Sequence, residues 1–447
     1  MERISLEELV TAIDGVHATP LARRVEFDRV RLDPRAITPG DLFWAISEKS
    51  VERQEQLALA EARGAMASVL ALNDAGARPG RIFVPDPRLA LARFARWYRS
   101  LLDAFAIGIA GENDGVTTRN MTRAALGLPA EDRHDDRDIR EQLALTLLDI
   151  AASDRYAVVA FGAGCGDAWE RLVDTARPEA VILTRQNRSQ SDRVLETFLA
   201  ALPRGGFAIL PGDHPGTRAV PRDSRVPALF VGRRSDNTHR VGGEEIASGR
   251  LKFRLDRSRF EIAAPGRHYS IPAGMAILAA RRLGRRDPEI AKNLEAFEPT
   301  AGCGTIALRS PWTIIDETAG DHRVSLVRAM ENVAEWPTTG RRILVYGHPS
   351  RRVTSQRARL WAFEKVDHLI TIGTFAGEVA QEARRAGRDA HSLAEFSQPD
   401  TASGWLRDLV RRGDVVWITS ARSAGLDRLV VDLIRHAEST SEIPMAA

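Results

Sequence analysis

The chain has 447 residues, more than one hydrophobic core ordinarily encloses, so two to four domains are expected. Hydrophobic residues make up 44% and charged residues 28% of the chain, which excludes a disordered composition and is typical of a soluble globular protein. The formal net charge is only +3 and both signs are mixed along the chain, so no nucleic-acid-binding surface is predicted.

The lack of targeting signals and the scarcity of cysteines predict a cytoplasmic protein. No apolar run approaches the roughly 18 residues of a membrane span, and the polar start of the chain lacks the core of a signal peptide. The two cysteines, Cys165 and Cys303, are far apart and form no disulfide or metal framework. Cys165 has no nearby histidine, which favours a plain small residue over a reactive thiol.

Lysine is scarce in this chain. Of the 63 basic residues only four are lysines, and the others are arginines: the lysines are Lys49, Lys252, Lys292 and Lys365. A GC-rich genome explains most of this bias. Because arginine cannot replace a lysine that must be a compact point charge or a modifiable amine, any lysine-dependent mechanism must use one of these four.

Residues 1–102 are predicted to form a first, small α/β unit. Ser5 followed by Glu8 is a capping box, so a helix is expected over residues 5–13. Alternating polar and apolar residues over 25–33 predict a strand. Further strands are expected at 41–46, 67–72 and 82–86, and helices at 51–64 and 87–102.

Residues 103–306 are predicted to form a second unit around the apolar run Phe105–Ala110, which is typical of a buried parallel strand. Gly111 ends this run, and a helix follows a polar turn from about Thr117. Strand, glycine turn and helix are the layout of a loop whose backbone N–H groups hold phosphates.

The chemical groups of such a loop are missing. A working phosphate loop ends in Gly-Lys-Ser/Thr, where the lysine contacts the terminal phosphates and the hydroxyl binds magnesium. The corresponding residues here are Asp114, Gly115 and Val116. The layout is therefore present without its lysine and its metal-binding hydroxyl, and Asp114 adds negative charge where phosphates would lie.

The remaining elements alternate between strands and helices. The second unit is expected to continue with strands at 156–161, 180–183, 207–210 and 228–231, a hairpin at 251–255 and 260–263, and helices at 268–283 and 288–297. Residues 307–447 are predicted to form a third, Rossmann-like unit. Its strands are expected at 312–315, 342–346, 368–372 and 415–418, and its helices at 321–335, 355–364, 374–387, 401–411 and 424–436.

Segments spread over nearly the whole chain resemble the Mur ligase family, and within it the branch that adds D-alanyl-D-alanine in peptidoglycan synthesis. They are Leu32–Ala45, Ile107–Thr118, Pro178–Thr184, Pro265–His268 and Trp312–Thr318. The resemblance implies a three-domain α/β fold: a UDP-substrate-binding domain, a central ATPase-like domain with a P-loop-type parallel sheet, and a Rossmann-like ligase domain. It also implies a reaction in which ATP phosphorylates a substrate carboxylate and an amine attacks the acyl phosphate.

The chain departs from the family pattern where that chemistry resides. Ala160 replaces a metal-binding Glu, Tyr269 replaces an Asn, and residues 182–203 contain neither the His nor the Lys of the family's second metal site. Residues 319–322 replace the segment that holds the nucleotide base. A charged contact to phosphate contributes about 1.5–3 kcal/mol, and losing one electrostatic donor lowers a rate by about 10²–10³. The combined losses predict an inactive ligase site.

The residues that remain are candidates for ligand binding. The candidates for a vestigial nucleotide site are Gly111, Asn113, Thr117, Thr118, His268 and Arg422, and those for the UDP moiety are Asp33 and Arg35. Each has a structural alternative: a turn without ligand for the loop residues, a helix-start histidine for His268, and a turn pair for Asp33 and Arg35. The acidic pair Asp316 and Glu317 is either part of a site or a solvated strand end. No catalytic residue and no metal ligand is assigned.

Two functions follow. The first is a catalytically degenerate Mur-ligase-like protein without a cofactor, acting as partner, scaffold or sensor in cell-wall precursor synthesis. Its partner would be an active Mur ligase or other cell-wall enzyme, or its ligand a UDP-linked muramyl peptide. The alternative is an active amide ligase, dependent on ATP and magnesium, that adds D-Ala-D-Ala or a similar amino compound to such a peptide. It requires Arg119 or Arg123 in place of the missing lysine.

Overall fold

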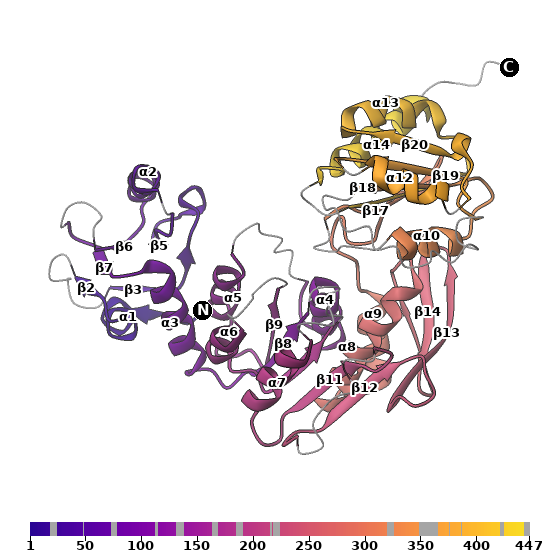
Figure 1. Ribbon diagram of the computed structural model, residues 1–447. Helices are drawn as coiled ribbons and strands as arrows, with labels where there is room; N and C mark the ends of the chain where they lie inside the picture. Colours follow the sequence, from indigo (N-terminus) through magenta and orange to yellow (C-terminus); the bar gives the residue numbers. More distant parts are fainter. Residues whose placement is uncertain are drawn as a thin grey trace.

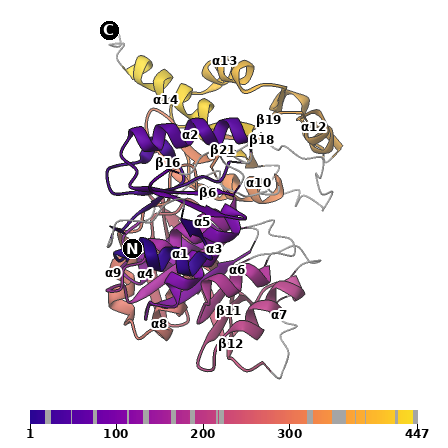
Figure 2. The same cartoon turned by 90° about the vertical axis from the view of Figure 1, so that its left-hand side faces the viewer.

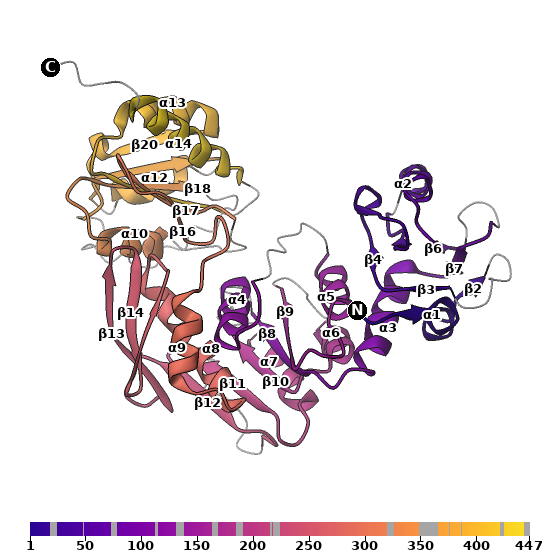
Figure 3. The same cartoon turned by 180° about the vertical axis from the view of Figure 1, so that it is seen from behind.

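The computed structural model describes most of the chain as three units built around β-sheets, with the second unit between the first and the third (Figures 1 and 3). The described residues are 1–17, 25–47, 49–72, 78–111, 115–130, 138–162, 169–184, 191–214, 217, 224–319, 326–347, 365–374, 376–385, 387–420 and 424–441. Within these residues no helix has the length and apolar character needed to cross a membrane.

The first unit contains a sheet with the strand order β2-β7-β6-β5-β4 and a short pair, β1 and β3. The expected strand at 25–33 is wrong as one element, because it is divided into two short strands that join different sheets. The elements are β1 Ile4–Ser5, α1 Leu6–Ile13, β2 Val16–His17, β3 Glu26–Phe27, β4 Val30–Arg31, η1 Pro34–Ala36, β5 Leu42–Trp44, α2 Ser50–Ala62, β6 Ala67–Ala71, β7 Arg81–Val84 and α3 Pro87–Arg99.

Local sequence signals set the helix starts in this unit. The predicted capping box is confirmed: the Ser5 hydroxyl accepts a hydrogen bond from the Glu8 amide, and the Glu8 carboxylate accepts one from the Ser5 amide. Asp86 caps α3 by accepting hydrogen bonds from two amides of its first turn, and Pro87 occupies the first helical position.

The second unit is built on a mixed sheet with the order β15-β14-β13-β12-β11-β10-β8-β9. The six neighbouring strands β13, β12, β11, β10, β8 and β9 are paired in parallel. Strands β14 and β15 extend the sheet beyond β13 in antiparallel pairing. The predicted hairpin corresponds to β14 and β15, whereas β13 was not predicted. The elements are β8 Phe105–Ala110, α4 Gly115–Ala125, α5 Ile139–Leu148, β9 Tyr156–Phe161, α6 Trp169–Ala176, β10 Ala180–Leu183, α7 Ser191–Ala201, β11 Phe207–Pro211, β12 Ala228–Gly232, β13 His239–Ala247, β14 Arg250–Leu255, β15 Ser258–Ile262, η4 Arg267–Tyr269, α8 Ser270–Arg282 and α9 Asp287–Glu295.

The third unit has the Rossmann-like sheet that the alternating pattern predicts, with the order β16-β17-β21-β18-β19-β20. Strands β17 to β20 are paired in parallel, and β16 is antiparallel. The predicted helix at 355–364 lies outside the described residues. The elements are β16 Thr305–Leu308, β17 Thr313–Glu317, α10 Leu326–Glu335, β18 Arg342–Gly347, β19 His368–Ile372, α12 Ala376–Arg385, η5 Ala390–Ser392, β20 Leu393–Phe396, α13 Pro399–Leu409, β21 Val415–Ser420 and α14 Asp427–Ser441.

The three-unit α/β architecture is the expected one. Strand β16 begins at Thr305, two residues before the predicted start of the third unit at residue 307. The domain limits 1–102, 103–306 and 307–447 stay a prediction.

The first two units share a hydrophobic core. Helix α3 packs against α5 and α6 of the second unit (Figure 2). The fully buried Tyr98 donates a hydrogen bond of 2.7 Å to the Ile150 carbonyl. Arg99, 5% exposed, bonds both carboxylate oxygens of Glu179 at 3.1 Å. These contacts fix the first unit against the amino-terminal edge of the central sheet.

An ion-pair network holds the hairpin turn to α8 and α9. Arg281 donates two hydrogen bonds of 2.8 Å to the Asp287 carboxylate and one of 3.1 Å to Asp256. Ser258 also donates to Asp287. The hydrogen bonds from Arg281 lower the pKa of Asp287, and the Ser258 hydroxyl lowers it further against the opposing effect of burial.

This network makes stability depend on pH. Because the folded pKa of Asp287 is lowered, its contribution is present above the unfolded value of about 3.9 and is lost as pH falls through the folded value. We expect Asp287→Asn to lower the free energy of unfolding at pH 7 by about 1.5 kcal/mol, and the difference to shrink below about pH 4. Urea unfolding at pH 7 and pH 3 measures it, with the exposed Asp408→Asn as control. An equal difference at both pH values would contradict the expectation.

Candidate functional site

The candidate site begins at the carboxyl end of β8, where Gly111 lies against Thr184 at the end of β10. The Thr184 amide donates a hydrogen bond of 2.7 Å to the Ala110 carbonyl. Gly111 has φ +149°, and a Cβ atom there would lie 2.0 Å from Thr184 Oγ1. Only glycine fits this close approach. The candidate Asn113, together with Asp114, lies outside the described residues.

Two further candidates, Thr117 and Thr118, lie on the first turns of α4. Thr117 is 7% exposed and Thr118 is fully buried. Within the described part of the chain, the Thr118 hydroxyl has no hydrogen-bond partner. Helix α4 begins at Gly115, two residues before the predicted start at Thr117. Both threonine side chains point into the protein.

The neighbouring strand carries no charged group at the expected metal position. Ala160 on β9 is paired with Ile109 of β8, so a methyl group stands where the resemblance implies a metal-binding carboxylate. The lysines are elsewhere: Lys49 precedes α2, Lys252 lies on β14, Lys292 on α9 and Lys365 precedes β19. None of the four belongs to β8, α4, β9 or β10.

The two arginines proposed as substitutes for the lysine differ in direction. Arg123 donates a hydrogen bond of 3.1 Å to the Pro129 carbonyl, beyond the carboxyl end of α4 and away from the loop. Arg119 is 6% exposed and donates a bond of 3.2 Å to the Asn120 side chain. Arg119 is therefore the better placed of the two for the alternative, catalytic reading.

A cleft of about 410 Å³ lies beside Thr184, between the second and third units. It is lined by Thr184, Pro211, Asp213, His214, Val231, Arg233, Glu244, Arg267, His268, Ile271, Pro272, Met275, Glu331, Asn332 and Glu335. Thr184 thus connects the end of β8 with the cleft.

The charged groups of the cleft are largely paired. Arg233 bonds the Glu244 carboxylate at 2.6 Å and Ser270 Oγ at 3.1 Å. Burial alone would raise the pKa of Asp213, but hydrogen bonds from the amides of Arg233 and Arg234 and from Asn237 hold the pKa below its ordinary value. Asp213 therefore stays ionised and fixes the turn after β12.

His268 lies in this cleft, but its ring contacts the third unit. Its Nδ1 is 3.0 Å from Asn332 Oδ1 on α10, and its Nε2 is 3.5 Å from Glu317 Oε1 at the end of β17. Next to it, the Arg267 guanidinium is 3.4 Å from the Glu335 carboxylate, also on α10. The segment η4 thus joins the second unit to the third. This position agrees with the structural alternative for His268, and a ligand-binding role stays a prediction.

Tyr269 occupies the position where the resemblance implies an asparagine. Its hydroxyl is 3.2 Å from Glu317 Oε1 and donates to the Cys303 carbonyl at 3.1 Å. A Cβ atom on Gly304 would lie 1.9 Å from this hydroxyl, so the packing around Tyr269 requires glycine there. The ring is 5% exposed and is part of the core rather than of a ligand surface.

The acidic pair at the end of β17 is not a solvated strand end. Glu317 is 8% exposed and accepts a hydrogen bond of 2.8 Å from the Trp417 indole. Burial raises the pKa of Asp316, opposed by hydrogen bonds from Thr318, and nearby Glu317 raises it further. The alternative of solvation is therefore wrong for Glu317.

The UDP candidates lie on the first unit and do not line the cleft. Asp33 Oδ1 accepts a hydrogen bond of 2.9 Å from the Arg35 amide and so caps η1, as expected for a turn pair. The Arg35 side chain is exposed. Arg422 lies outside the described residues.

The structure therefore places Gly111 at the end of β8, Thr117 and Thr118 on the following helix α4, and His268 in contact with Asn332 of α10. Sequence reasoning missed Arg233, Glu244, Asn332 and Glu335. They come from the turn after β12, from β13 and from α10, and no local pattern marks them as neighbours.

The chain is similar over nearly its whole length to known ligases. It is 23% identical over 450 residues to the UDP-N-acetylmuramoyl-tripeptide--D-alanyl-D-alanine ligase of Escherichia coli, covering 91% of this chain and 93% of the relative. The ligase of the same name from Bacillus subtilis is 20% identical over 97% of this chain and 99% of the relative. No family model matches the chain.

Solved structures agree in fold. MurF from Acinetobacter baumannii superposes with a TM-score of 0.81 at 19% identity, covering 97% of this chain and 99% of that chain. MurF ligase from Thermotoga maritima, solved in complex with ADP, gives 0.71 at 17% identity over 92% and 98% of the two chains. In sequence and in fold the chain is thus similar to the Mur ligases.

This similarity confirms the resemblance to the family and the three-unit α/β architecture. It leaves the individual site residues as predictions. Among the described residues no group of three or more His, Cys, Asp or Glu side chains is arranged to hold a metal ion.

Proposed function

We propose that this chain is a MurF-like protein of peptidoglycan precursor synthesis that binds a UDP-linked muramyl peptide without forming an acyl phosphate. It would serve as partner, scaffold or sensor. The proposal rests chiefly on one observation: the end of β8 keeps the tight glycine turn against Thr184, while Ala160 of β9 is paired with Ile109 near that end and none of the four lysines belongs to β8, α4, β9 or β10.

The residues present do not fit ATP with magnesium. A phosphate loop needs a lysine for the terminal phosphates and a hydroxyl or carboxylate for the metal. In their places the chain has Gly115, Val116 and Ala160. The side chains of His268 and Tyr269 also contact Asn332 and Glu317 of the third unit.

One observation favours the second candidate function, an active ATP-dependent amide ligase. The Thr118 hydroxyl is buried without a partner among the described residues, and Arg119 is buried on the same helix. A rebuilt site would use these groups together with Thr117.

The test is calorimetric titration with ATP-magnesium and then with UDP-linked muramyl tripeptide. It is followed by a phosphate-release assay with both compounds and D-Ala-D-Ala. We expect micromolar binding of the tripeptide precursor and no phosphate release. Phosphate release that disappears in Thr117→Ala would overturn the proposal in favour of the ligase. No binding of the precursor would also overturn it.

A further inference from the structure

The connection that joins α9 of the second unit to β16 of the third is tied down on both sides. The Asn120 side chain on α4 donates a hydrogen bond of 2.6 Å to Thr300 Oγ1. The Gly302 carbonyl accepts a bond of 2.9 Å from the amide of Ala319, which follows β17. Only Ala301 separates these two anchors. Because a hinge needs several residues whose backbone dihedrals can change, this connection is poorly suited to be one.

Tyr269 closes the junction from the side of the second unit. Its hydroxyl donates to the Cys303 carbonyl at 3.1 Å and lies 3.2 Å from Glu317 Oε1. Cys303 belongs to the connection, and Glu317 lies at the end of β17. Tyr269 therefore holds both the connecting segment and the third unit itself.

A second contact is made by the hairpin of β13 and β14, whose turn reaches the third unit (Figures 1 and 3). Ile246 of β13 packs against the hydrophobic cores of both units. The Arg309 guanidinium donates a hydrogen bond of 3.4 Å to the Ser248 carbonyl in the turn. Gly249, with φ +75°, approaches β16 so closely that a Cβ atom would lie 2.3 Å from Ile306 Cδ1. The turn is thus seated on an edge strand of the third sheet.

A third contact joins η4 to α10. Arg267 pairs with Glu335 at 3.4 Å, and His268 Nδ1 lies 3.0 Å from Asn332 Oδ1. The His268 ring is folded back over Gly266, where a Cβ atom would lie only 2.5 Å from Nδ1. The glycine therefore leaves the room that the ring needs to reach α10.

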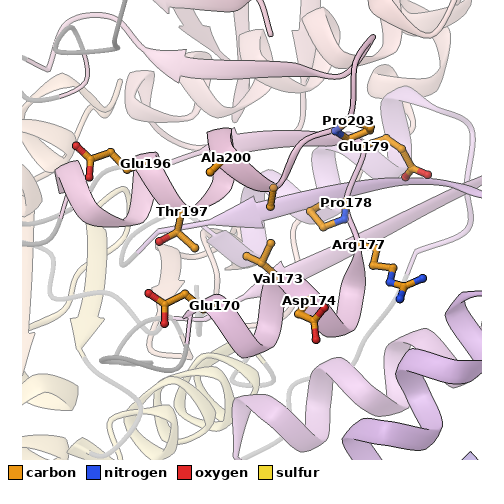
Figure 4. A pocket seen from close by; sticks show the side chains of 11 residues that line it. Glu170, Val173, Asp174, Arg177, Pro178, Glu179, Glu196, Thr197, Ala200 and Pro203 are labelled. Atoms are coloured by element: carbon orange, nitrogen blue, oxygen red, sulfur yellow. The ribbon is translucent and has the colours of Figure 1, made fainter. Parts of the chain in front are cut away.

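The first unit is also fixed to the second. Arg96 and Arg99 of α3 pair with Asp174 at 2.7 Å and with Glu179 at 3.1 Å. These two carboxylates line a groove of about 880 Å³ between α6 and α7 (Figure 4). Since the two units also share a hydrophobic core, a change of shape would have to occur at the junction of the second and third units.

We infer that the second and third units form one rigid body in the absence of any ligand, so that the cleft between them is preformed and does not open or close. Domains joined by a flexible linker ordinarily move relative to each other. Here the connection is pinned, and β16, β17 and α10 each contact the second unit, so a rotation about one contact would break another. The inference is independent of precursor binding. It adds to the proposed function that the three units keep a fixed spacing, as a scaffold requires.

The test is a distance measurement by pulsed electron paramagnetic resonance on the full chain. Nitroxide labels are attached to Lys292→Cys on α9 and Glu378→Cys on α12, both at exposed positions, in a Cys165→Ser background. The buried Cys303 is left in place. Distances are recorded without ligand, with ATP-magnesium and with UDP-linked muramyl tripeptide.

Two substitutions each disturb one contact. Gly249→Asn keeps the turn, because asparagine tolerates a positive φ, but its side chain wedges against β16. Gly284→Asn is its control, at φ +83° with no atom of the described residues within 4 Å. Gly266→Ala displaces the His268 ring, and Gly242→Ala, where a Cβ atom also meets nothing among the described residues, is the matched control.

We expect one narrow distance distribution in the wild-type chain, unchanged by ATP-magnesium or the precursor. Gly249→Asn and Gly266→Ala should each broaden it, and together they should add a population at longer distance, whereas both controls leave it unchanged. Circular dichroism verifies that each variant is folded, and the single variants still decide the question if the double variant unfolds. A broad or two-peaked wild-type distribution, a shift on adding either compound, or variants that match their controls would overturn the inference. The ligand-free comparison needs no precursor, so its failure is distinguishable from failure of the proposed function.

Discussion

Replacing Glu317 by leucine is expected to lower the free energy of unfolding by about 3 kcal/mol or more. The substitution removes the acceptor of the buried Trp417 indole N–H and the carboxylate that faces Tyr269 and His268. Leucine has a suitable size but offers no acceptor, so the buried indole keeps an unpaired donor. Urea unfolding measures the loss.

The exposed residue Glu378 on α12 supplies the matched control, because Glu378→Leu removes the same charge at the surface. Its effect is expected to stay within about 0.5 kcal/mol. Glu317→Gln should fall between the two, since the amide retains one acceptor oxygen. A loss below 1 kcal/mol in Glu317→Leu would show that the carboxylate is not what holds η4, β17 and β21 together.

Arg35→Ala is expected to weaken binding of UDP-linked muramyl tripeptide by about 10- to 100-fold. A charged hydrogen bond to the diphosphate is worth about 1.5–3 kcal/mol. The melting temperature should not change, because the Arg35 side chain is exposed. Calorimetric titration of the precursor measures the effect.

Two variants make this result interpretable. Arg257→Ala removes another exposed arginine, from the turn between β14 and β15, and should leave the affinity unchanged. Asp33→Ala should reduce stability as well as affinity, because Asp33 caps η1. An unchanged affinity in Arg35→Ala would return Asp33 and Arg35 to the role of a structural turn pair.

Local patterns predicted much of the fold. The run Phe105–Ala110 forms the buried parallel strand β8, the Ser5 capping box starts α1, and the repeated strand–helix alternation after residue 307 forms the Rossmann-like sheet. Each of these signals is carried by residues close together in the sequence, because apolar periodicity and helix capping involve near neighbours along the chain. Strand β13 was missed although it has nine residues, because its sequence, with two adjacent glycines and two adjacent glutamates, does not alternate regularly between polar and apolar residues. The four-residue strand β20 was also missed.

The sequence by itself determined what chemistry this chain has available. None of the four lysines lies in the segment 111–116 that follows β8, so that loop contains no lysine in any fold, and the valine at position 116 offers no metal ligand. Only the tertiary structure decided how the remaining polar groups are used. His268 meets Asn332 across 64 residues, Glu317 is buried beside Trp417 across 100 residues, and Arg99 of the first unit reaches Glu179 of the second. Such contacts depend on which strand ends and helix faces the sheets bring together, and residue spacing along the chain does not encode that arrangement.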